Sequence, residues 1–205
     1  MFDHIAILMD DIKYMEKPEW VSWEEVLACL HEAHKVNKKK GFTMQGYDMT
    51  MERFKAKLGD GKCFVALDGD KVIGIATVKF IKSRRWCAWG KKVAYNGLDG
   101  ILKSYQGTDV FPSLNALRYK CIRENGVDMV EFNTAEYNKV VIKRNLMQGA
   151  KKVQYAHARL AKDKYYSIVM MKWLNGCPYP DWLCNLMFKL SQIAVKLSDI
   201  GSRSK

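Results

Sequence analysis

The chain has 205 residues, of which 48% are apolar and 27% charged, a balance typical of a folded globular protein that excludes a long disordered region. Lys and Arg number 34 and Asp and Glu 22, so the formal net charge is +12, which favours polyanionic partners such as phosphates, nucleic acid or an anionic membrane face. No run approaches the roughly 18 apolar residues of a membrane span, and the first twenty residues lack the basic start and cleavage site of a signal peptide. We therefore expect a soluble, cytoplasmic protein.

The six cysteines lie in presumed helices and strands without a C-x-x-C pair. This distribution predicts reduced, mostly buried thiols rather than a disulfide framework or a zinc site. His31 and His34 share one face of a predicted helix, but no second ligand pair follows at the spacing of a metal site. The sequence therefore predicts no bound metal.

The first eighty residues predict two helices and a hairpin. Ser22 and Glu25 form a capping box before the apolar repeat of residues 23–34, which predicts a helix there. A second, shorter helix is predicted over residues 50–58. Residues 63–80 are rich in strand-forming side chains on both sides of an Asp-Gly turn, which predicts a β-hairpin.

Strands and helices alternate in the rest of the chain, with no internal repeat and no low-complexity tract. The predicted elements are strands over residues 86–95 and 98–105, a helix over 112–123, a strand over 127–133, a helix over 138–147, and strands over 152–160 and 165–173. This order predicts an α/β fold.

The segment over residues 98–112 is a strand-to-helix crossover. In such a crossover the free backbone N–H groups of the first helical turn form a site for anions. Gly107 lets the backbone approach a phosphate closely, Lys103 adds positive charge, and Pro112 suits a first helical turn. These features fit a phosphate-binding turn, and they also fit a plain connection.

The turn reads Gln106-Gly107-Thr108-Asp109-Val110-Phe111, and together with the order of elements over residues 23–173 it resembles the GCN5-related N-acetyltransferase (GNAT) superfamily. In that family the turn begins with Gln or Arg followed by Gly, and its N–H groups hold the pyrophosphate of acetyl-CoA. Asp109 and Phe111 depart from the small residues usual at their positions. The resemblance implies acetyl-CoA or another acyl-CoA as co-substrate, with contacts from Leu102, Lys103, Gln106, Gly107, Thr108, Asp109 and Val110.

A second block of the sequence carries the same resemblance. Asn133 ends a predicted strand, Asn138 opens the next helix, and Asn145 and Gly149 follow at the family's spacing. The resemblance implies that Asn133 and Asn138 contact the pantetheine arm. Asn145 stands where many members have a Tyr that protonates the departing thiolate, and because an amide cannot give up a proton at neutral pH it would orient or stabilise instead. Without the resemblance, Asn138 and Asn145 are cap and surface residues of an ordinary helix.

Transfer of an acyl group from a thioester to an amine needs a base, an oriented carbonyl and a leaving thiolate, without a covalent intermediate. Glu131 is the first candidate for the base because it shares a strand face with Asn133. Asp99 and Glu136 are alternatives, as is direct deprotonation through water, and each of these carboxylates also fits a structural role. Weaker candidates are Tyr95, Tyr105 and His157.

After a breaker at residues 175–180 the sequence becomes amphipathic, which predicts a helix with a basic end. We therefore expect a GNAT-like domain over residues 1–175 and a C-terminal helix and tail over residues 176–205. Packing of this helix on the domain, or on a second copy in a homodimer, is the first interpretation. The alternative is that it lies on a membrane or a lipid-linked substrate, with Trp182 and Phe188 as lining residues.

These observations predict an α/β fold with a mixed, mostly antiparallel sheet that splays between the strands ending near Tyr105 and at Asn133, flanked by helices. The expected function is transfer of an acetyl or other acyl group from acyl-CoA to a primary amine of a small molecule. The net charge favours a neutral or anionic acceptor, such as an amino sugar on a nucleotide diphosphate or lipid phosphate, or an amino-acid-like amine. Two alternatives are a catalytically silent CoA-binding or interaction domain and a basic nucleic-acid-binding module, although no nucleic-acid reader motif is present.

Overall fold

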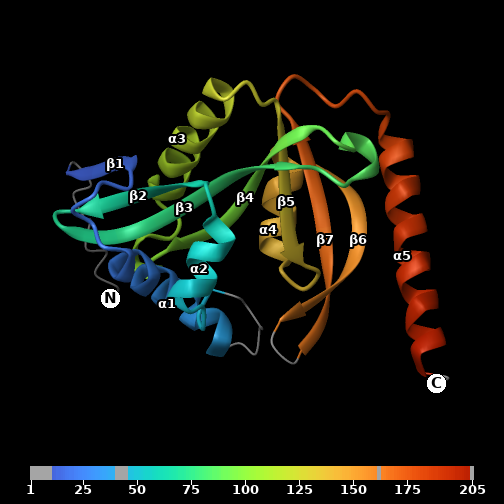
Figure 1. Ribbon diagram of the computed structural model, residues 1–205, viewed down its shortest axis with the longest axis horizontal. Coiled ribbons are helices and arrows are strands. Elements are labelled where there is room, and N and C mark those ends of the chain that lie inside the picture. The colour runs from blue at the N-terminus through green and yellow to red at the C-terminus, as the bar shows by residue number, and fades with distance from the viewer. Residues whose placement is uncertain (1–10, 40–45, 161–162, 204–205) are drawn as a thin grey trace, which may run out of the picture. The chain divides into compact units, whose positions relative to one another are not determined.

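The computed structural model describes residues 11–39, 46–160 and 163–203. Seven strands form one mixed, mostly antiparallel sheet in the order β1-β2-β3-β4-β5-β7-β6 (Figure 1), which confirms the predicted fold class. The strands are β1 Ile12–Glu16, β2 Lys62–Asp68, β3 Lys71–Lys82, β4 Lys92–Ile101, β5 Met129–Ala135, β6 Lys151–Leu160 and β7 Asp163–Trp173. The α-helices are α1 Trp23–Lys39, α2 Met51–Leu58, α3 Val110–Glu124, α4 Lys139–Met147 and α5 Asp181–Arg203, and the short 3₁₀ helices are η1 Trp86–Ala88 and η2 Lys103–Tyr105.

The chain divides into two compact units. The first unit comprises the described residues of 11–77 together with 98–120, and the second comprises 78–97 and the described residues from 121 onward. The long strands β3 and β4 contribute to both units.

In the first unit, α1 begins at the capping box that the sequence predicts, and α2 begins at an N-cap threonine. Ser22 donates from its backbone N–H and its hydroxyl to Glu25, both at 2.7 Å, and Glu25 N–H donates back to the Ser22 hydroxyl at 3.2 Å. Thr50 accepts a hydrogen bond from Arg53 N–H at the start of α2. Gly74 on β3 has no side chain, and an added Cβ would lie 3.0 Å from Val110, so this glycine lets the first turn of α3 pack close to the sheet.

In the second unit, β5, β7 and β6 form antiparallel pairs over a continuous apolar cluster. The cluster is made of Cys87, Ala88, Val93, Met129, Val153, Val169, Met171 and Trp173. The predicted C-terminal helix is present as α5, which runs beside the edge strand β6 (Figure 1). Tyr155 N–H on β6 donates to the Ser191 hydroxyl on α5 at 2.8 Å, so a helix side chain satisfies a donor of this edge.

The region between β3 and α3 differs from the prediction of two separate strands. Residues 86–88 form η1, a single strand β4 runs through Asn96 and Gly97, and residues 103–105 form η2. Gly97 suggests a turn in isolation, but β4 lies between β3 and β5 in the sheet, and this pairing outweighs the local preference. Helix α3 also begins at Val110, two residues before Pro112, because a proline in the first turn loses no helical hydrogen bond.

Candidate functional site

The turn that precedes α3, in the first unit, contains three consecutive backbone N–H groups that have no hydrogen-bond partner in the described part of the chain. Gly107 adopts a φ of 86°, a conformation that glycine tolerates best. The Thr108 hydroxyl donates to Tyr105 O at 2.6 Å. Ser113 N–H donates to Asp109 O at 2.9 Å, and with this hydrogen bond α3 begins. Within the described residues, the N–H groups of Gly107, Thr108 and Asp109 make no hydrogen bond. Such a group of free donors at the positive end of a helix is suited to an anion.

The side chains predicted to bind the co-substrate divide into two sets here. Leu102 and Val110 are buried and fix the turn, whereas Lys103, Gln106 and Asp109 are exposed. The Gln106 amide donates to Ile101 O at 3.0 Å. Tyr105, a weaker catalytic candidate, donates its hydroxyl to the Asp68 carboxylate, and this hydrogen bond raises the pKa of the phenol.

Asp99, an alternative base, belongs to an ion pair of the first unit. Its Oδ1 accepts a 2.6 Å hydrogen bond from the Arg118 guanidinium, which is almost fully buried. The same guanidinium also reaches Asn115 Oδ1 at 2.7 Å and Thr77 O at 3.3 Å. A buried arginine of this kind requires its carboxylate, so the geometry favours a structural role for Asp99.

Glu131, the first candidate for the base, is also paired. Its side chain is 2% exposed, and Oε1 accepts from Arg85 Nε and Nη2 at 2.9 and 2.8 Å. Oε2 accepts from the Ser83 hydroxyl at 3.3 Å, and Arg85 Nη1 donates in addition to Gln154 Oε1. Taking up a proton here would weaken a buried charge pair, and the carboxylate is almost fully shielded from solvent, so the geometry favours a structural role for Glu131.

The parallel pairing of β4 with β5 is short. It consists of three residue pairs and ends at Asn96 and Phe132, within the described part of both strands. Beyond that point β5 presents Asn133, whose side-chain oxygen accepts a hydrogen bond from the Ser167 hydroxyl on β7 while the residue stays exposed. The Asn96 amide is buried, and neither of its polar atoms finds a partner among the described residues. Unpaired buried amides are uncommon, so the Asn96 side chain marks an unsatisfied polar position where the β4–β5 pairing ends.

Helix α4 carries the other two asparagines of the predicted motif. Asn138 is its N-cap and accepts from Val141 N–H at 3.4 Å, which leaves its amide N–H₂ available as a donor. Asn145 is buried on the same helix, with 2% of its surface exposed. The structure therefore places Asn145 in the packed side of α4 rather than on its surface.

A cluster of ionisable side chains in the second unit was largely missed by sequence reasoning. The Tyr155 hydroxyl on β6 donates to Glu136 Oε2 at 2.6 Å, and the Tyr155 ring stacks on Tyr166 of β7 with centroids 5.2 Å apart. The Tyr166 hydroxyl donates to Asp199 Oδ2 on α5 at 2.5 Å, and Asp199 Oδ1 lies 3.1 Å from His157 Nε2. Burial, followed by the hydrogen bond to Glu136, raises the pKa of Tyr155, so the phenol stays protonated at neutral pH.

The strand register brings this cluster together. His157 is opposite Tyr166, and Tyr155 is opposite Ile168, so all three aromatic side chains share one face of the β6–β7 ladder. Tyr155 and His157 are two residues apart in the sequence, which is the available signal for a shared strand face. Their partners are Glu136 in the loop after β5, Tyr166 on β7 and Asp199 on α5, and these long-range contacts have no signal in the local sequence pattern.

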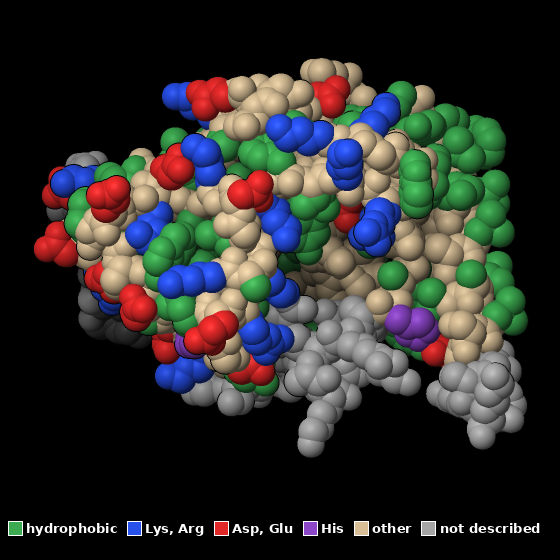
Figure 2. Space-filling model, viewed as in Figure 1, with side chains coloured by type: hydrophobic (Ala, Val, Ile, Leu, Met, Phe, Trp, Pro, Cys, Tyr) green, Lys and Arg blue, Asp and Glu red, His purple; other side chains and the backbone are tan. Residues whose placement is uncertain are grey.

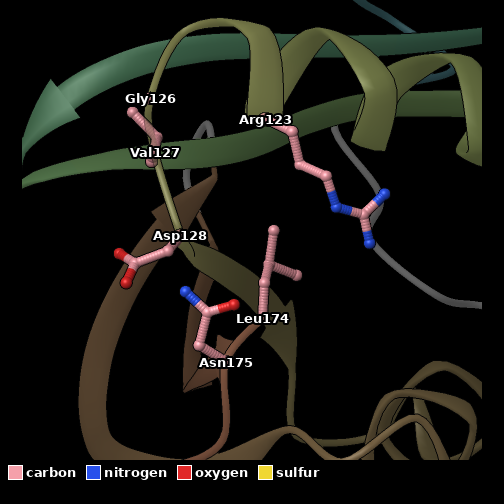
Figure 3. Close-up of a pocket in the computed structure, with 6 residues that line it drawn as sticks. All are labelled: Arg123, Gly126, Val127, Asp128, Leu174 and Asn175. Atoms are coloured by element: carbon pink, nitrogen blue, oxygen red, sulfur yellow. The ribbon is translucent and has the colours of Figure 1, made fainter.

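The cavity formed at the opposite end of β5 does not gather polar groups. It has a volume of about 340 Å³ and is lined by Arg123, Gly126, Val127, Asp128, Leu174 and Asn175. Figure 3 shows the Arg123 guanidinium and the Asp128 carboxylate pointing away from one another. The cavity therefore lacks the convergent polar groups of a binding site.

The described residues contain no cluster of three or more His, Cys, Asp or Glu side chains that could hold a metal ion. His31 Nε2 lies 2.8 Å from Met49 O, and His34 Nε2 lies 2.9 Å from Asp99 O, so both rings are bound to backbone carbonyls. The six cysteines are thiols that form no disulfide with one another. Burial raises the pKa of Cys29, Cys63 and Cys87 to about 12, which makes them poor nucleophiles.

Comparison with known proteins identifies the fold. No protein-family sequence model matches the chain, and no curated protein matches it in sequence. Its structure is similar to that of a probable acetyltransferase from Staphylococcus epidermidis, with a TM-score of 0.62 at 11% identity over 79% of this chain and 98% of the other. A GNAT family acetyltransferase from Elizabethkingia anophelis with acetyl-CoA bound gives 0.57 at 10% identity over 80% and 99%. A ribosomal-protein-alanine N-acetyltransferase from Brucella melitensis gives 0.57 at 13% identity over 79% and 99%.

The chain therefore has the GNAT fold, as the sequence resemblance implied. The similar structures named above are those of acetyltransferases.

Proposed function

We propose that the chain is an acyl-CoA-dependent N-acyltransferase. The observation that carries the proposal is the group of free N–H donors at Gly107, Thr108 and Asp109, which lies before α3 in a GNAT fold. The turn fits a phosphate group because an added Cβ at Gly107 would have nothing within 4 Å, so space is open there. The exposed Asp109 side chain can turn toward solvent and leave the backbone donors accessible. Acyl-CoA would supply the activated acyl group, and the similar structure from E. anophelis has acetyl-CoA bound.

The remaining contacts with acyl-CoA are assigned to asparagines of the second unit. Asn133 is exposed and Asn138 half-buried, and each has an amide N–H₂ that can donate to the carbonyls of a pantetheine arm. Asn145 cannot supply a proton, so the departing CoA thiolate would take its proton from water. The acceptor is a primary amine of a small molecule, and the charge of +12 favours a neutral or anionic one.

We assign the base to Glu136 rather than to Glu131. Glu136 is half-buried in the loop after β5, three residues beyond Asn133, and its Oε2 is held by the Tyr155 hydroxyl. Its Oε1 makes no hydrogen bond with any described residue, so it is available to accept a proton from an amine. Tyr155 acts as a positioning residue, because its raised pKa keeps the hydroxyl protonated and donating to the carboxylate.

Binding of acetyl-CoA, measured by calorimetry, tests the phosphate-binding turn. Gly107→Asp places a carboxylate beside the free donors, and we expect it to weaken binding at least tenfold. Gly126→Asp is a matched control, since Gly126 lies at the other end of α3, also has a positive φ and also has open space around it. Both variants should lose similar stability, about 1 kcal/mol, because both force a side chain into the left-handed region. Equal loss of binding in the two variants would show that the turn is not the site.

Release of CoA in the presence of an amine library tests the transfer step. The catalytically silent CoA-binding domain is the alternative, and Asn145 in place of the family's tyrosine is the residue that favours it. Binding of acetyl-CoA without release of CoA for any amine would establish this alternative. An absence of both heat of binding and thermal stabilisation would remove both interpretations.

A further inference from the structure

Helix α5 has apolar side chains on two opposite faces. One face packs against β6, where Cys184 and Phe188 are buried and Phe188 meets the Tyr155 ring edge-on. The other face carries five large apolar residues that are exposed to solvent: Trp182 (66%), Leu186 (44%), Leu190 (49%), Ile193 (54%) and Leu197 (62%). At about 100° per residue, these five, which we call the α5 stripe, centre on the side of the helix opposite to Cys184 and Phe188. A helix on the surface of a soluble protein normally has one apolar face, so the α5 stripe needs a partner.

Figure 2 shows hydrophobic side chains gathered along the edge of the view where Figure 1 draws α5. A further exposed aromatic residue, Trp89, lies in the turn between η1 and β4 and is 73% exposed. This turn is tied to the segment that leads into α5, because the Tyr179 hydroxyl donates to Cys87 O at 3.2 Å and the Tyr179 ring packs on Trp86. The turn that carries Trp89 therefore lies close to the segment that precedes α5 in the second unit.

Basic side chains accompany both apolar features. Lys82, Arg84, Lys91 and Lys92 are exposed around the turn that carries Trp89. Lys189 and Lys196 are exposed on α5, and at helical spacing both lie along one border of the stripe. Exposed tryptophan, an aliphatic stripe and flanking lysines are the combination that binds the interface of an anionic membrane.

A second copy of the chain is the weaker choice of partner. The exposed fractions of the five side chains and Trp89 correspond to roughly 700 Å² per copy, so two copies together bury about 1,400 Å², which reaches only the lower part of the roughly 1,200–2,000 Å² of a stable dimer. Two copies with a net charge of +12 each would also repel one another. An anionic lipid surface attracts the same charge, and lysines at the border of the stripe can extend to the headgroups while their stems cover apolar surface.

We propose that the second unit docks on an anionic membrane surface, with the α5 stripe and Trp89 in the interface and the flanking lysines on the headgroups. In this arrangement α5 lies along the membrane surface; none of the described helices has the length and hydropathy of a membrane span. This inference does not depend on the proposed enzymatic activity.

Cosedimentation of the full chain with large unilamellar vesicles tests the proposal. We expect binding to vesicles of phosphatidylcholine with 30% phosphatidylglycerol, little binding to pure phosphatidylcholine, and weakening by salt. Leu190→Gln combined with Ile193→Gln removes apolar side chains without changing charge, and it should weaken binding at least tenfold. The matched control is Val140→Gln combined with Met147→Gln, because both residues are 79% exposed on α4, away from the stripe, and it should bind as the parent does.

Three outcomes would overturn the proposal. The first is no binding of the folded parent chain to anionic vesicles. The second is binding that the two variants reduce equally, since the stripe would then contribute nothing. The third is a parent chain that is dimeric by light scattering and ignores vesicles, with the Leu190 and Ile193 variant monomeric, which would make the stripe a subunit interface. Circular dichroism of each variant establishes that its fold is retained.

Discussion

Removing either partner of the Arg85–Glu131 ion pair should destabilise the protein, and by unequal amounts. Arg85→Met leaves a carboxylate that is 2% exposed and has, among the described residues, only the Ser83 hydroxyl as a hydrogen-bond partner, which costs about 3–5 kcal/mol. Glu131→Gln leaves an amide oxygen that still accepts from Arg85, and the guanidinium is 23% exposed and can be hydrated, so the cost is about 1–2 kcal/mol. The difference of about 2 kcal/mol corresponds to roughly 4–8 °C in Tm for a chain of this length.

Urea denaturation at pH 7, followed by far-UV circular dichroism, measures both losses. Lys35→Met is the matched control, since it breaks the Lys35–Glu32 pair, in which both side chains are 60% exposed, and it should cost less than about 0.5 kcal/mol. Equal losses for the two variants of the buried pair would contradict the reasoning from burial. A Glu131→Gln protein with full stability and a kcat lowered more than a hundredfold would restore Glu131 as the base.

The proposed base predicts that Glu136→Gln lowers kcat at least a hundredfold and flattens its pH profile, with the Kd for acetyl-CoA unchanged. Tyr155→Phe should lower kcat less and keep the profile, and a larger effect than that of Glu136→Gln would argue against a positioning role. A separate prediction concerns His34, whose pKa burial lowers below its usual 6.5. The unfolded chain therefore takes up the proton first, so stability that is present above about pH 6.5 is lost as the pH falls toward the folded pKa. His34→Gln should reduce the slope of unfolding free energy between pH 7 and 5, and an unchanged slope would assign it to other groups.

The parts of the fold that the sequence predicted rest on local interactions. The Ser22 and Glu25 capping box spans three residues, and the hairpin around Gly69 needs only its turn and two apolar strands. Pairing within such short segments depends little on the rest of the chain, so local patterns are sufficient to find it.

The candidate site was harder to predict because its decisive contacts join distant residues. Glu131 meets Arg85 from 46 positions away, and no pattern near Glu131 indicates that its carboxylate is buried and paired. The cluster around Tyr155 likewise includes a distant residue, Asp199. It reaches the cluster because α5 packs beside β6, where Asp199 accepts a hydrogen bond from the Tyr166 hydroxyl. The periodicity of α5 was readable, but which face packs on β6 and which remains exposed depends on tertiary contacts.

Helix α5 also covers an edge of the sheet, where Tyr155 N–H donates to the Ser191 hydroxyl. Strand β6 ends the sheet, and α5 lies against it where another strand could otherwise pair. A chain shortened before Asp181 would lose this cover and present an open edge for pairing with other molecules, so we expect it to aggregate. Point substitutions on the outer face of α5 are for that reason the appropriate way to separate its role at a membrane from its protection of the sheet.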